Sequence, residues 1–278
     1  TDSNKLNIAR IWKAYLYHRI TDLYGDIPYS EAAKANSTQV FLPKYDTQEF
    51  IYKDLLKELD EAATALDPAK PSFGKADFIY DGDVTKWKKF SYSLMLRLGL
   101  RLSKVDPALS KTWVTKAIAG GVILNGTDNA IMKYTDGPND FNRNPVGFDA
   151  RRQDFTAGSY GQKNVEGGKL AKTFIDLLKT TADPRISVYA GVWQGTVQNT
   201  TLAAQKGFPN GTKVAPTPLE QATYSEPNQN TIFKYDAPLV LISNAETNLY
   251  LAEAAARGWY TAETHKDLYE KAVNASFL

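Results

Sequence analysis

The spacing of apolar residues in residues 1–124 predicts four helices. In four segments, apolar side chains recur every three or four positions, which places them on one face of a helix. The segments are residues 5–24, 46–66, 83–102 and 106–120. In the first three, the faces expected to be buried are Ile8, Trp12, Tyr15, Leu16, Ile20 and Leu23; Tyr52, Leu55, Leu59, Ala62 and Leu66; and Trp87, Phe90, Leu94, Leu98 and Leu102. Successive helices separated by short breaks are typical of helical hairpins packed in series.

Residues at the ends of these segments support the predicted boundaries. Gly25 is expected to end the first helix, and a proline three residues later makes its continuation unfavourable. Asp46 lies in the cap position of an Asp-Thr-Gln-Glu sequence that resembles a capping box. Asp83 is a good N-cap for the third helix. Asp106 is a good N-cap for the fourth, because it is followed by proline at the first helical position.

The middle of the chain has a different composition. Residues 125–168 are rich in Gly, Asn, Asp and Pro, and a connection of this length without regular structure is usually functional. A helix is expected over 169–179 and a short strand over 186–192, followed by a second polar stretch over 195–230. The first polar stretch carries the scattered aromatic residues Tyr134, Phe141, Phe148, Phe155 and Tyr160. We therefore expect a loop-rich subdomain over 125–235.

The helical pattern returns over 236–278. The apolar face expected there consists of Ile242, Ala245, Leu249, Ala252 and Ala256. Gly258 is expected to end this helix and Thr261 to start the next, whose Tyr-x-x-Ala sequence resembles a tetratricopeptide unit. The predicted fold is a single domain, 1–278, that is mainly α, with tetratricopeptide-like helical hairpins and a long irregular loop-rich insertion. Because both ends lie beside helical patterns, we expect the chain to be a fragment or a processed form.

Composition narrows the chemistry that this chain can perform. Its 278 residues include 33 Lys and Arg and 31 Asp and Glu, so the formal net charge of +2 gives no reason to expect nucleic acid binding. The absence of cysteine excludes disulfides, thiolate nucleophiles and cysteine metal sites. With only His18 and His265, neither a multi-histidine metal site nor a cofactor is expected, and His18 is expected to be a surface or packing residue. No apolar run approaches the roughly 18–20 residues that span a bilayer, and no signal peptide is visible.

Segments that resemble catalytic motifs are incomplete. Ala157–Gly161 approaches the G-x-S-x-G nucleophile elbow around Ser159, but a polar loop precedes it and alanine replaces its first glycine. Glu166–Leu170 approaches a phosphate-binding loop but lacks two of its defining residues. Glu246 and Glu253 share a helix face, as a pair of glycosidase carboxylates does, although carboxylates are common on helices. We therefore expect no catalytic residues.

Aromatic residues in the polar loops form the candidate ligand site. The ring of an aromatic residue covers the C–H face of a sugar, while neighbouring polar groups bind its hydroxyl groups. Residues of both kinds occur close together in this part of the sequence, and the candidate glycan contacts are Phe148, Arg151, Asp154, Tyr160 and Trp193. A second interpretation stays open, in which these rings form a small core beneath their own loop.

Several segments, in the same order, resemble the SusD/RagB-like family of surface-exposed, nutrient-binding outer-membrane lipoproteins of Bacteroidota. The segments are Ala14–Arg19, Leu23–Tyr29, Tyr52–Ala62, Gly82–Phe90, Asp183–Ile186 and Asn244–Ala254. The Tyr-Gly-Asp-Ile-Pro turn and the Gly-Asp-x-x-Lys-Trp helix start are specific when they occur together. The physical role of these residues is structural, because they end, cap or anchor helices.

The resemblance implies a helical, tetratricopeptide-like fold and a function without catalysis. It implies a cell-surface glycan-binding protein of the outer membrane that partners a SusC-like TonB-dependent transporter for oligosaccharide or polysaccharide uptake. Attachment to the membrane would then depend on a lipid anchor that this sequence does not contain. Two alternatives remain: a tetratricopeptide-like scaffold that binds peptides or other proteins, and a glycoside or ester hydrolase that uses loop carboxylates such as Asp149 or Asp154.

Overall fold

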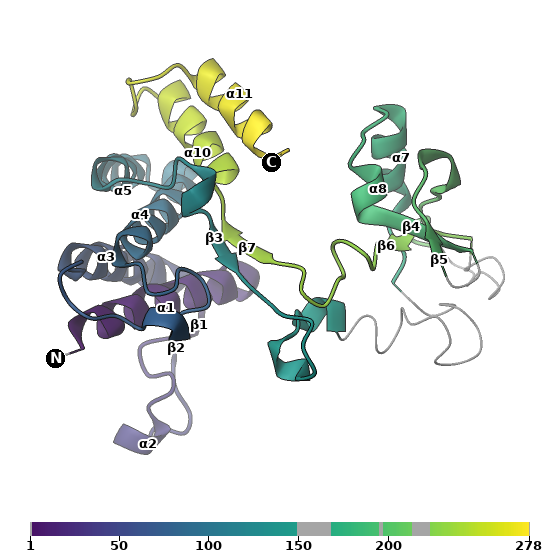
Figure 1. Ribbon diagram of the computed structural model, residues 1–278. Helices are drawn as coiled ribbons and strands as arrows, with labels where there is room; N and C mark the ends of the chain where they lie inside the picture. Colours follow the sequence, from purple (N-terminus) through teal and green to yellow (C-terminus); the bar gives the residue numbers. More distant parts are fainter. Residues whose placement is uncertain (1, 149–167, 195–196, 213–222, 278) are drawn as a thin grey trace. The chain divides into compact units, whose positions relative to one another are not determined.

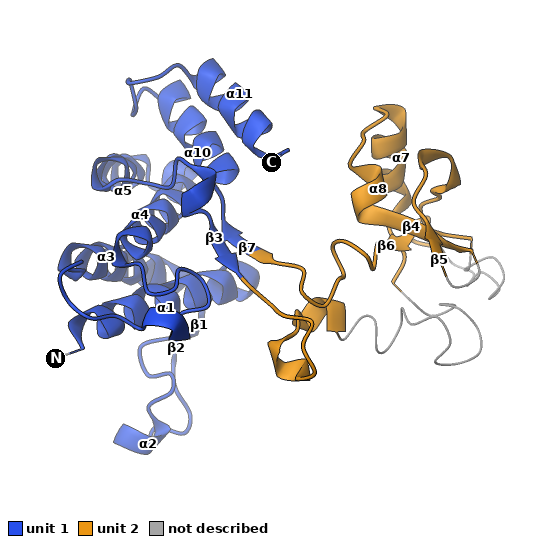
Figure 2. Cartoon of the chain, viewed as in Figure 1, with its two compact units in different colours: residues 1–132, 240–278 blue, residues 133–239 orange. Residues whose placement is uncertain are grey.

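The computed structural model describes residues 2–148, 168–194, 197–212 and 223–277 of the chain. These residues form two compact units, shown in blue and orange in Figure 2. Unit 1 combines the two ends of the chain, Thr1–Met132 and Val240–Leu278, and unit 2 is the intervening segment, Lys133–Leu239.

Unit 1 is built from helices that pair as neighbours (Figure 1). In chain order they are α1 (Ser3–Tyr24), α2 (Ala35–Thr38), α3 (Gln48–Ala65), α4 (Val84–Arg101), α5 (Pro107–Gly120), α10 (Asn244–Ala256) and α11 (His265–Ala275), with short 3-10 turns η1 (Gly74–Ala76), η2 (Leu102–Lys104) and η3 (Gly126–Asp128). Helix α3 packs against both α1 and α4, α4 packs against α5, and α10 packs against α11 and α4. The predicted fold class, mainly α with helical hairpins, is confirmed.

Two pairs of short strands complete unit 1. Strands β1 (Ile27–Pro28) and β2 (Tyr45–Asp46) pair at the base of the loop that carries α2. Strand β3 (Ala130–Met132) pairs with β7 (Leu239–Ile242), which is where the chain leaves unit 1 and where it returns. The two ends of the segment that forms unit 2 therefore lie beside each other.

Helix α4 forms the centre of the core of unit 1. It is buried on nearly all sides, and this includes two serines whose hydroxyl groups are satisfied inside the protein. Ser91 Oγ donates to the carbonyl of Leu59 at 2.8 Å, and Ser93 Oγ accepts from the backbone N–H of Ile123 at 2.8 Å. A buried hydroxyl without such a partner would be costly. These hydrogen bonds connect α4 to its neighbours on two sides.

The predicted helix starts are confirmed at two positions and wrong at two others. The carboxylates of Asp83 and Asp106 accept from the first-turn N–H groups of α4 and α5. Helix α3, however, is capped by Thr47, whose Oγ1 accepts from the N–H of Phe50 at 3.3 Å. Asp46 cannot cap it because its carboxylate accepts from Ser30 N at 2.6 Å across the β1–β2 pair. Helix α11 likewise begins after Thr264 rather than at Thr261.

The predicted buried faces of the first helix and of α10 are also wrong in part. On α1, Leu16, Ile20 and Leu23 are exposed, and Leu23 is 73% exposed. The buried positions are instead Asn4, Asn7, Ile8, Ile11, Ala14, Tyr15, His18 and Thr21. On α10, Leu249 is exposed, whereas Leu251 is buried. Half of the buried residues of α1 are polar and have partners inside the protein. The positions of the apolar residues alone therefore do not predict which face of α1 is buried.

Unit 2 contains short elements around a small core. They are η4 (Asp140–Asn142), α7 (Lys172–Thr180), α8 (Ile186–Tyr189), β4 (Ala190–Gln194), β5 (Val197–Asn199), η5 (Leu202–Ala204) and β6 (Glu226–Pro227). Strand β4 lies between β5 and β6, and both pairings are antiparallel. The strand expected over 186–192 begins only at Ala190. Asp183 explains the difference, because it accepts from Arg185 N at 2.9 Å and opens the turn that leads into α8.

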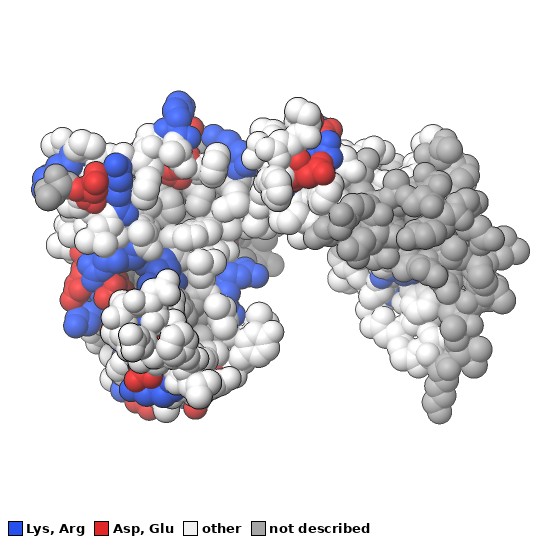
Figure 3. Space-filling model, turned by 90° about the horizontal axis from the view of Figure 1, so that it is seen from below, with Lys and Arg blue, Asp and Glu red and all other residues white. Residues whose placement is uncertain are grey.

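Basic and acidic side chains lie close to one another on the face of the molecule shown in Figure 3. The helices also carry i,i+3 and i,i+4 ion pairs, for example Lys53 with Glu49 and Arg257 with Glu253. This mixture agrees with the near-neutral net charge of the sequence. Within the described ranges, no helix is both long and apolar enough to cross a membrane.

Candidate functional site

A cavity lined by aromatic and charged side chains lies in unit 2. Its volume is about 330 Å³, and its lining residues are Tyr134, Asp140, Phe141, Arg143, Pro145 and Phe148. All six come from the segment that follows β3, within the first polar stretch of the sequence. Its size falls within the range of small-molecule sites. One of the five candidate glycan contacts, Phe148, is thus part of a cavity.

Asn144 holds the backbone of this cavity in place. It is buried; its N–H donates to Tyr235 O at 2.7 Å, and its Nδ2 donates to Ala237 O at 2.8 Å. Its Oδ1 accepts from the N–H groups of Val146 and Gly147, which starts the helical turn that carries Phe148. One side chain therefore joins the cavity segment to a distant part of the chain and also caps a turn.

Gly147 allows these two segments to approach closely. A Cβ atom at this position would lie 2.9 Å from the carbonyl oxygens of Phe233 and Lys234, a distance that real Cβ contacts do not reach. Glycine is needed here for this packing and not for an unusual backbone angle. The returning segment, 233–237, therefore packs directly against the turn that carries Phe148.

Arg143 is fixed between two rings and two carboxylates. Its guanidinium carbon lies 4.3 Å from the ring centroid of Tyr235 and 5.9 Å from that of Phe148, within the range of cation–π contacts. Its Nη1 donates to Asp140 Oδ1 at 2.6 Å, and its Nε lies 3.4 Å from an oxygen of Asp136. Because several partners hold it, Arg143 presents its donors in a defined direction with little loss of side-chain freedom on binding.

The aromatic residue that faces solvent at this cavity is Phe141, which is 95% exposed. Asn139 positions it, because Asn139 Oδ1 accepts from the N–H of Phe141 at 3.1 Å at the start of η4. Tyr134 adds a phenol, and burial raises its pKa above the ordinary value, so it remains protonated at physiological pH. The cavity thus combines an exposed ring face with groups that donate and accept hydrogen bonds.

The other predicted contacts have different places. Arg151, Asp154 and Tyr160 lie outside the described residues, as does Ser159 of the incomplete hydrolase motif. Trp193 lies on β4 and is half-buried; its Nε1 donates to Glu226 Oε2 at 2.8 Å. Glu226 is fully buried and also pairs with Lys169. The indole N–H is thus used inside the protein, so any ligand contact of Trp193 would have to involve its ring.

Phe141 is one of the scattered aromatic residues of the first polar stretch, but neither it nor Arg143 nor Tyr235 is among the five candidate contacts. The first two lie in the stretch that was expected to hold the ligand site, and their alternation of acidic, aromatic and basic residues is the signal that marks them. Tyr235 has no local signal, because its role depends on Asn144 pairing with a segment far along the chain. The contacts described for Phe148 and for Trp193 involve different residues. Within the described ranges, no group of His, Cys, Asp and Glu is arranged to hold a metal ion.

Comparison with known proteins identifies the family to which this chain is similar. The model of a family described as starch-binding and associating with the outer membrane, of the SusD-like kind, matches residues 1–278. No curated protein matches the chain.

Solved structures with the same fold are similar to nearly the whole chain. A chitin-binding protein is 30% identical with a TM-score of 0.76, and the match covers 99% of this chain and 56% of that one. A SusD homolog from Bacteroides uniformis is 30% identical with a TM-score of 0.78, covering 98% and 52%. A chitin-binding SusD homolog from Flavobacterium johnsoniae is 28% identical with a TM-score of 0.75, covering 98% and 52%.

The chain therefore spans about half the length of these structures. The helical hairpins of unit 1 and the inserted unit 2 account for the match over almost all of its own length. The family model and these likenesses agree with each other, and together they show that this chain belongs to the SusD-like family.

Proposed function

We propose that this chain is part of a glycan-binding protein that captures oligosaccharides at the surface of the outer membrane and passes them to a SusC-like TonB-dependent transporter. The family description supports both glycan binding and association with the outer membrane. Capture followed by release to a partner requires binding without cleavage. The protein acts by binding alone, as the incomplete hydrolase motif also suggests.

The observation that carries this proposal is Phe141 beside the cavity of unit 2. Phe141 is 95% exposed and lines the cavity together with polar side chains, so its ring face is open to a ligand at this place. Next to it, Arg143 is held by Asp140 and Tyr235, and these groups supply directed polar contacts. A ring face beside fixed donors and acceptors suits the two kinds of surface of a sugar.

The candidate contacts named from the sequence extend this site. Phe148 lies inside the cavity and Trp193 offers a ring face on β4, and both remain part of the proposal. Arg151, Asp154 and Tyr160 follow Phe148 directly in the sequence, so we include them as well. The names of two similar structures make chitin oligosaccharides the first class of ligand to test.

Isothermal titration with chitohexaose and maltohexaose tests the proposal. We expect one of these ligands to bind the wild-type protein, and Phe141→Ala to weaken that binding about tenfold, equivalent to about 1.4 kcal/mol. Phe78→Ala is the matched control, since Phe78 is 70% exposed and belongs to unit 1, whereas the cavity residues belong to unit 2. Absence of binding to either sugar would contradict glycan capture of these classes. Equal affinity of Phe141→Ala and wild type would remove Phe141 from the site.

A further inference from the structure

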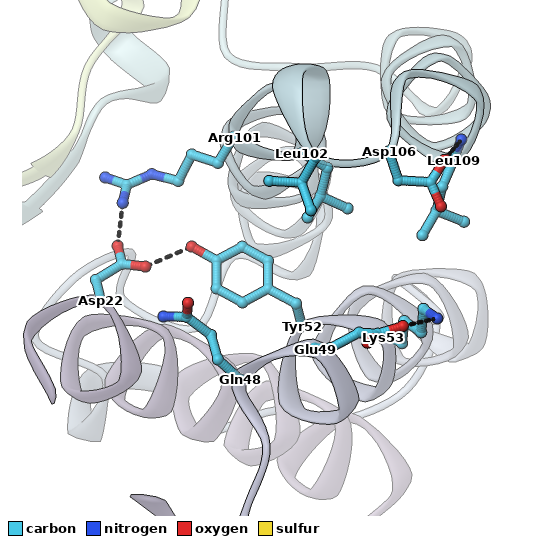
Figure 4. Close-up of a pocket in the computed structure, with 10 residues that line it drawn as sticks. Asp22, Gln48, Glu49, Tyr52, Lys53, Arg101, Leu102, Asp106 and Leu109 are labelled. Atoms are coloured by element: carbon cyan, nitrogen blue, oxygen red, sulfur yellow. Dashed lines mark hydrogen bonds and ion pairs between the residues drawn. The ribbon is translucent and has the colours of Figure 1, made fainter. Parts of the chain in front are cut away.

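Unit 1 contains two adjoining cavities that the proposed glycan site does not use. One has a volume of about 680 Å³ and lies between α1, α3 and the corner formed by the end of α4, η2 and the start of α5. The other, of about 360 Å³, lies between α1, α4 and α10. Asp22 and Arg101 line both cavities, so this ion pair lies between them (Figure 4).

The ion pair is part of a fixed network. Asp22 accepts hydrogen bonds from Arg101 and from the hydroxyl of Tyr52, as the dashed lines in Figure 4 show, and its Oδ2 lies 2.9 Å from Nε2 of the buried His18. Burial alone would raise the pKa of Asp22, but the contacts with His18 and Tyr52 outweigh it and hold the pKa below its usual value. Asp22 is therefore ionised and fully engaged, whereas about half of the Arg101 side chain is exposed to an incoming group.

The smaller cavity has an excess of positive charge. Three arginines line it, Arg19, Arg97 and Arg101, against two carboxylates, Asp22 and Glu246. Arg97 is neutralised by Glu246 through two hydrogen bonds of 2.8 Å, and Arg101 pairs with Asp22. Arg19 remains exposed at the rim. The cavity therefore favours an anionic group.

The larger cavity has the opposite excess. Its lining carboxylates are Asp22, Glu49 and Asp106, against the cations Lys53 and Arg101. Glu49 pairs with Lys53 at 2.5 Å on the exposed side of α3, and Asp106 caps α5 (Figure 4). The end of the cavity that lies opposite the Asp22–Arg101 pair therefore favours a cationic group.

Between these charges lies apolar surface that no described part of the chain covers. Val105 is 83% exposed, and Leu102 and Leu109 are half-buried beside it in the lining of the larger cavity. On the side of the smaller cavity, Leu23 is exposed as well. Of the tyrosines that line these two cavities, Tyr52 is buried and Tyr250 is half-buried, so neither offers a fully exposed ring face like that of Phe141 in unit 2.

We infer that this surface of unit 1 is a docking site for an extended peptide segment of another protein. An acidic side chain of the segment binds at the arginine-rich cavity, an apolar side chain packs on Leu102, Val105 and Leu109, and a basic side chain faces Glu49 and Asp106. Complementary charges at both ends fix the direction of the segment, and the apolar centre supplies the contact area. Helical hairpins packed in series commonly bind peptides on such surfaces.

Selection of random twelve-residue peptides displayed on phage, with the biotinylated protein as bait, tests this inference. We expect enriched peptides that combine an acidic, an apolar and a basic residue in one order. Their synthetic versions should lose at least tenfold in affinity for Val105→Asp, measured by fluorescence polarisation. Val197→Asp is the matched control because Val197 is 66% exposed in unit 2, and it should bind these peptides as the wild type does.

A second variant tests the direction of the charges. In Arg101→Gln, affinity should fall several-fold for the selected peptides and stay unchanged for versions in which the acidic residue is replaced by its amide. Thermal melts of each variant show whether the fold is kept. Peptides that bind wild type and Val105→Asp equally, or no enrichment over bare surface, would refute the docking site.

Two further readouts separate this inference from its competitors. Size-exclusion chromatography would reveal a wild-type dimer that Val105→Asp dissolves, and the occupant would then be a second copy of this chain, against the inference. Binding of chitohexaose or maltohexaose by Val105→Asp should equal that of the wild type. Phe141→Ala should in turn keep its peptide affinity, so the peptide site and the glycan site can fail separately.

Discussion

At the scale of single residues, Trp87 joins the core to the loop before α4. Its indole is 2% exposed and packs against Tyr80 and Phe90, with ring centroids 5.5 and 5.3 Å away. Its Nε1 donates to Asp77 Oδ2 at 2.6 Å, and the carboxylate of Asp77 also accepts from three backbone N–H groups of the loop. A buried apolar contact and the organisation of a loop thus depend on one side chain.

Replacing Trp87 should therefore be costly. We expect Trp87→Ala to lower the free energy of unfolding by about 3–5 kcal/mol, because it leaves a cavity and removes a partner of a buried carboxylate. Trp87→Phe keeps most of the ring and should cost less. Urea denaturation followed by circular dichroism measures both values. A loss below about 1 kcal/mol for the alanine variant would show that the indole contributes little to the core.

Asp22 makes the stability of unit 1 depend on pH. Its pKa is lowered in the folded state by His18 and Tyr52, despite burial. A carboxyl group with a lowered pKa stabilises the fold above its unfolded pKa of about 3.9, and this contribution is lost as the pH falls through the folded-state pKa.

We expect the free energy of unfolding of the wild type to fall between pH 5 and about pH 3, in part through Asp22. Asp22→Asn should be less stable at pH 7, but it should lose less stability over the same pH range, because it has no proton to gain. Urea melts at several pH values measure this. Glu49→Gln, which removes an exposed carboxylate of the same unit, should follow the wild-type pH profile. If Asp22→Asn also follows the wild-type pH profile, Asp22 does not cause the loss of stability at low pH.

At the scale of elements, local sequence patterns determine where helices begin, whereas long-range contacts determine which helix face is buried. The ends of α4 and α5 could be predicted from Asp83 and Asp106, because a cap acts within its own first turn. The buried face of α1 could not. Its inner side carries His18, which contacts the carboxylate of Asp22, and Thr21, whose hydroxyl donates to the carbonyl of Gly25. The spacing of apolar residues does not reveal such polar contacts.

Asn144 provides a test of how an element depends on a distant segment. Asn144→Ala removes the bonds to Ala237 O and to the N–H groups of Val146 and Gly147. We expect glycan affinity measured by titration to fall at least tenfold, because Phe148 and Arg143 lose their support, with a small loss in melting temperature. Asn125→Ala, on an exposed position of unit 1, should change neither. Unchanged affinity of Asn144→Ala would show that the cavity does not need this support.

At the scale of the whole molecule, the helical class and the presence of an irregular insertion could be predicted from the sequence, because they follow from periodicity and composition. The composition of its stretch also pointed to Phe148, which lines the cavity of unit 2, and its contact with a ligand stays a prediction. Tyr235 could not be predicted, since it packs on Phe148 and Arg143 only through the pairing of segments that are far apart in the chain. The docking surface of unit 1 was equally hidden, because Asp22, Arg101 and Glu246 come from three helices.

The pairing of β3 with β7 has a consequence for how such proteins diversify. Unit 2 leaves unit 1 at Met132 and returns at Val240, on strands that are hydrogen-bonded neighbours. A segment whose two ends meet in this way can change length and sequence without altering the packing of the helices that flank it, as in other inserted domains. Sequence change can therefore accumulate in the inserted segment, and with it at the proposed glycan site, while the packing of the helical scaffold is kept.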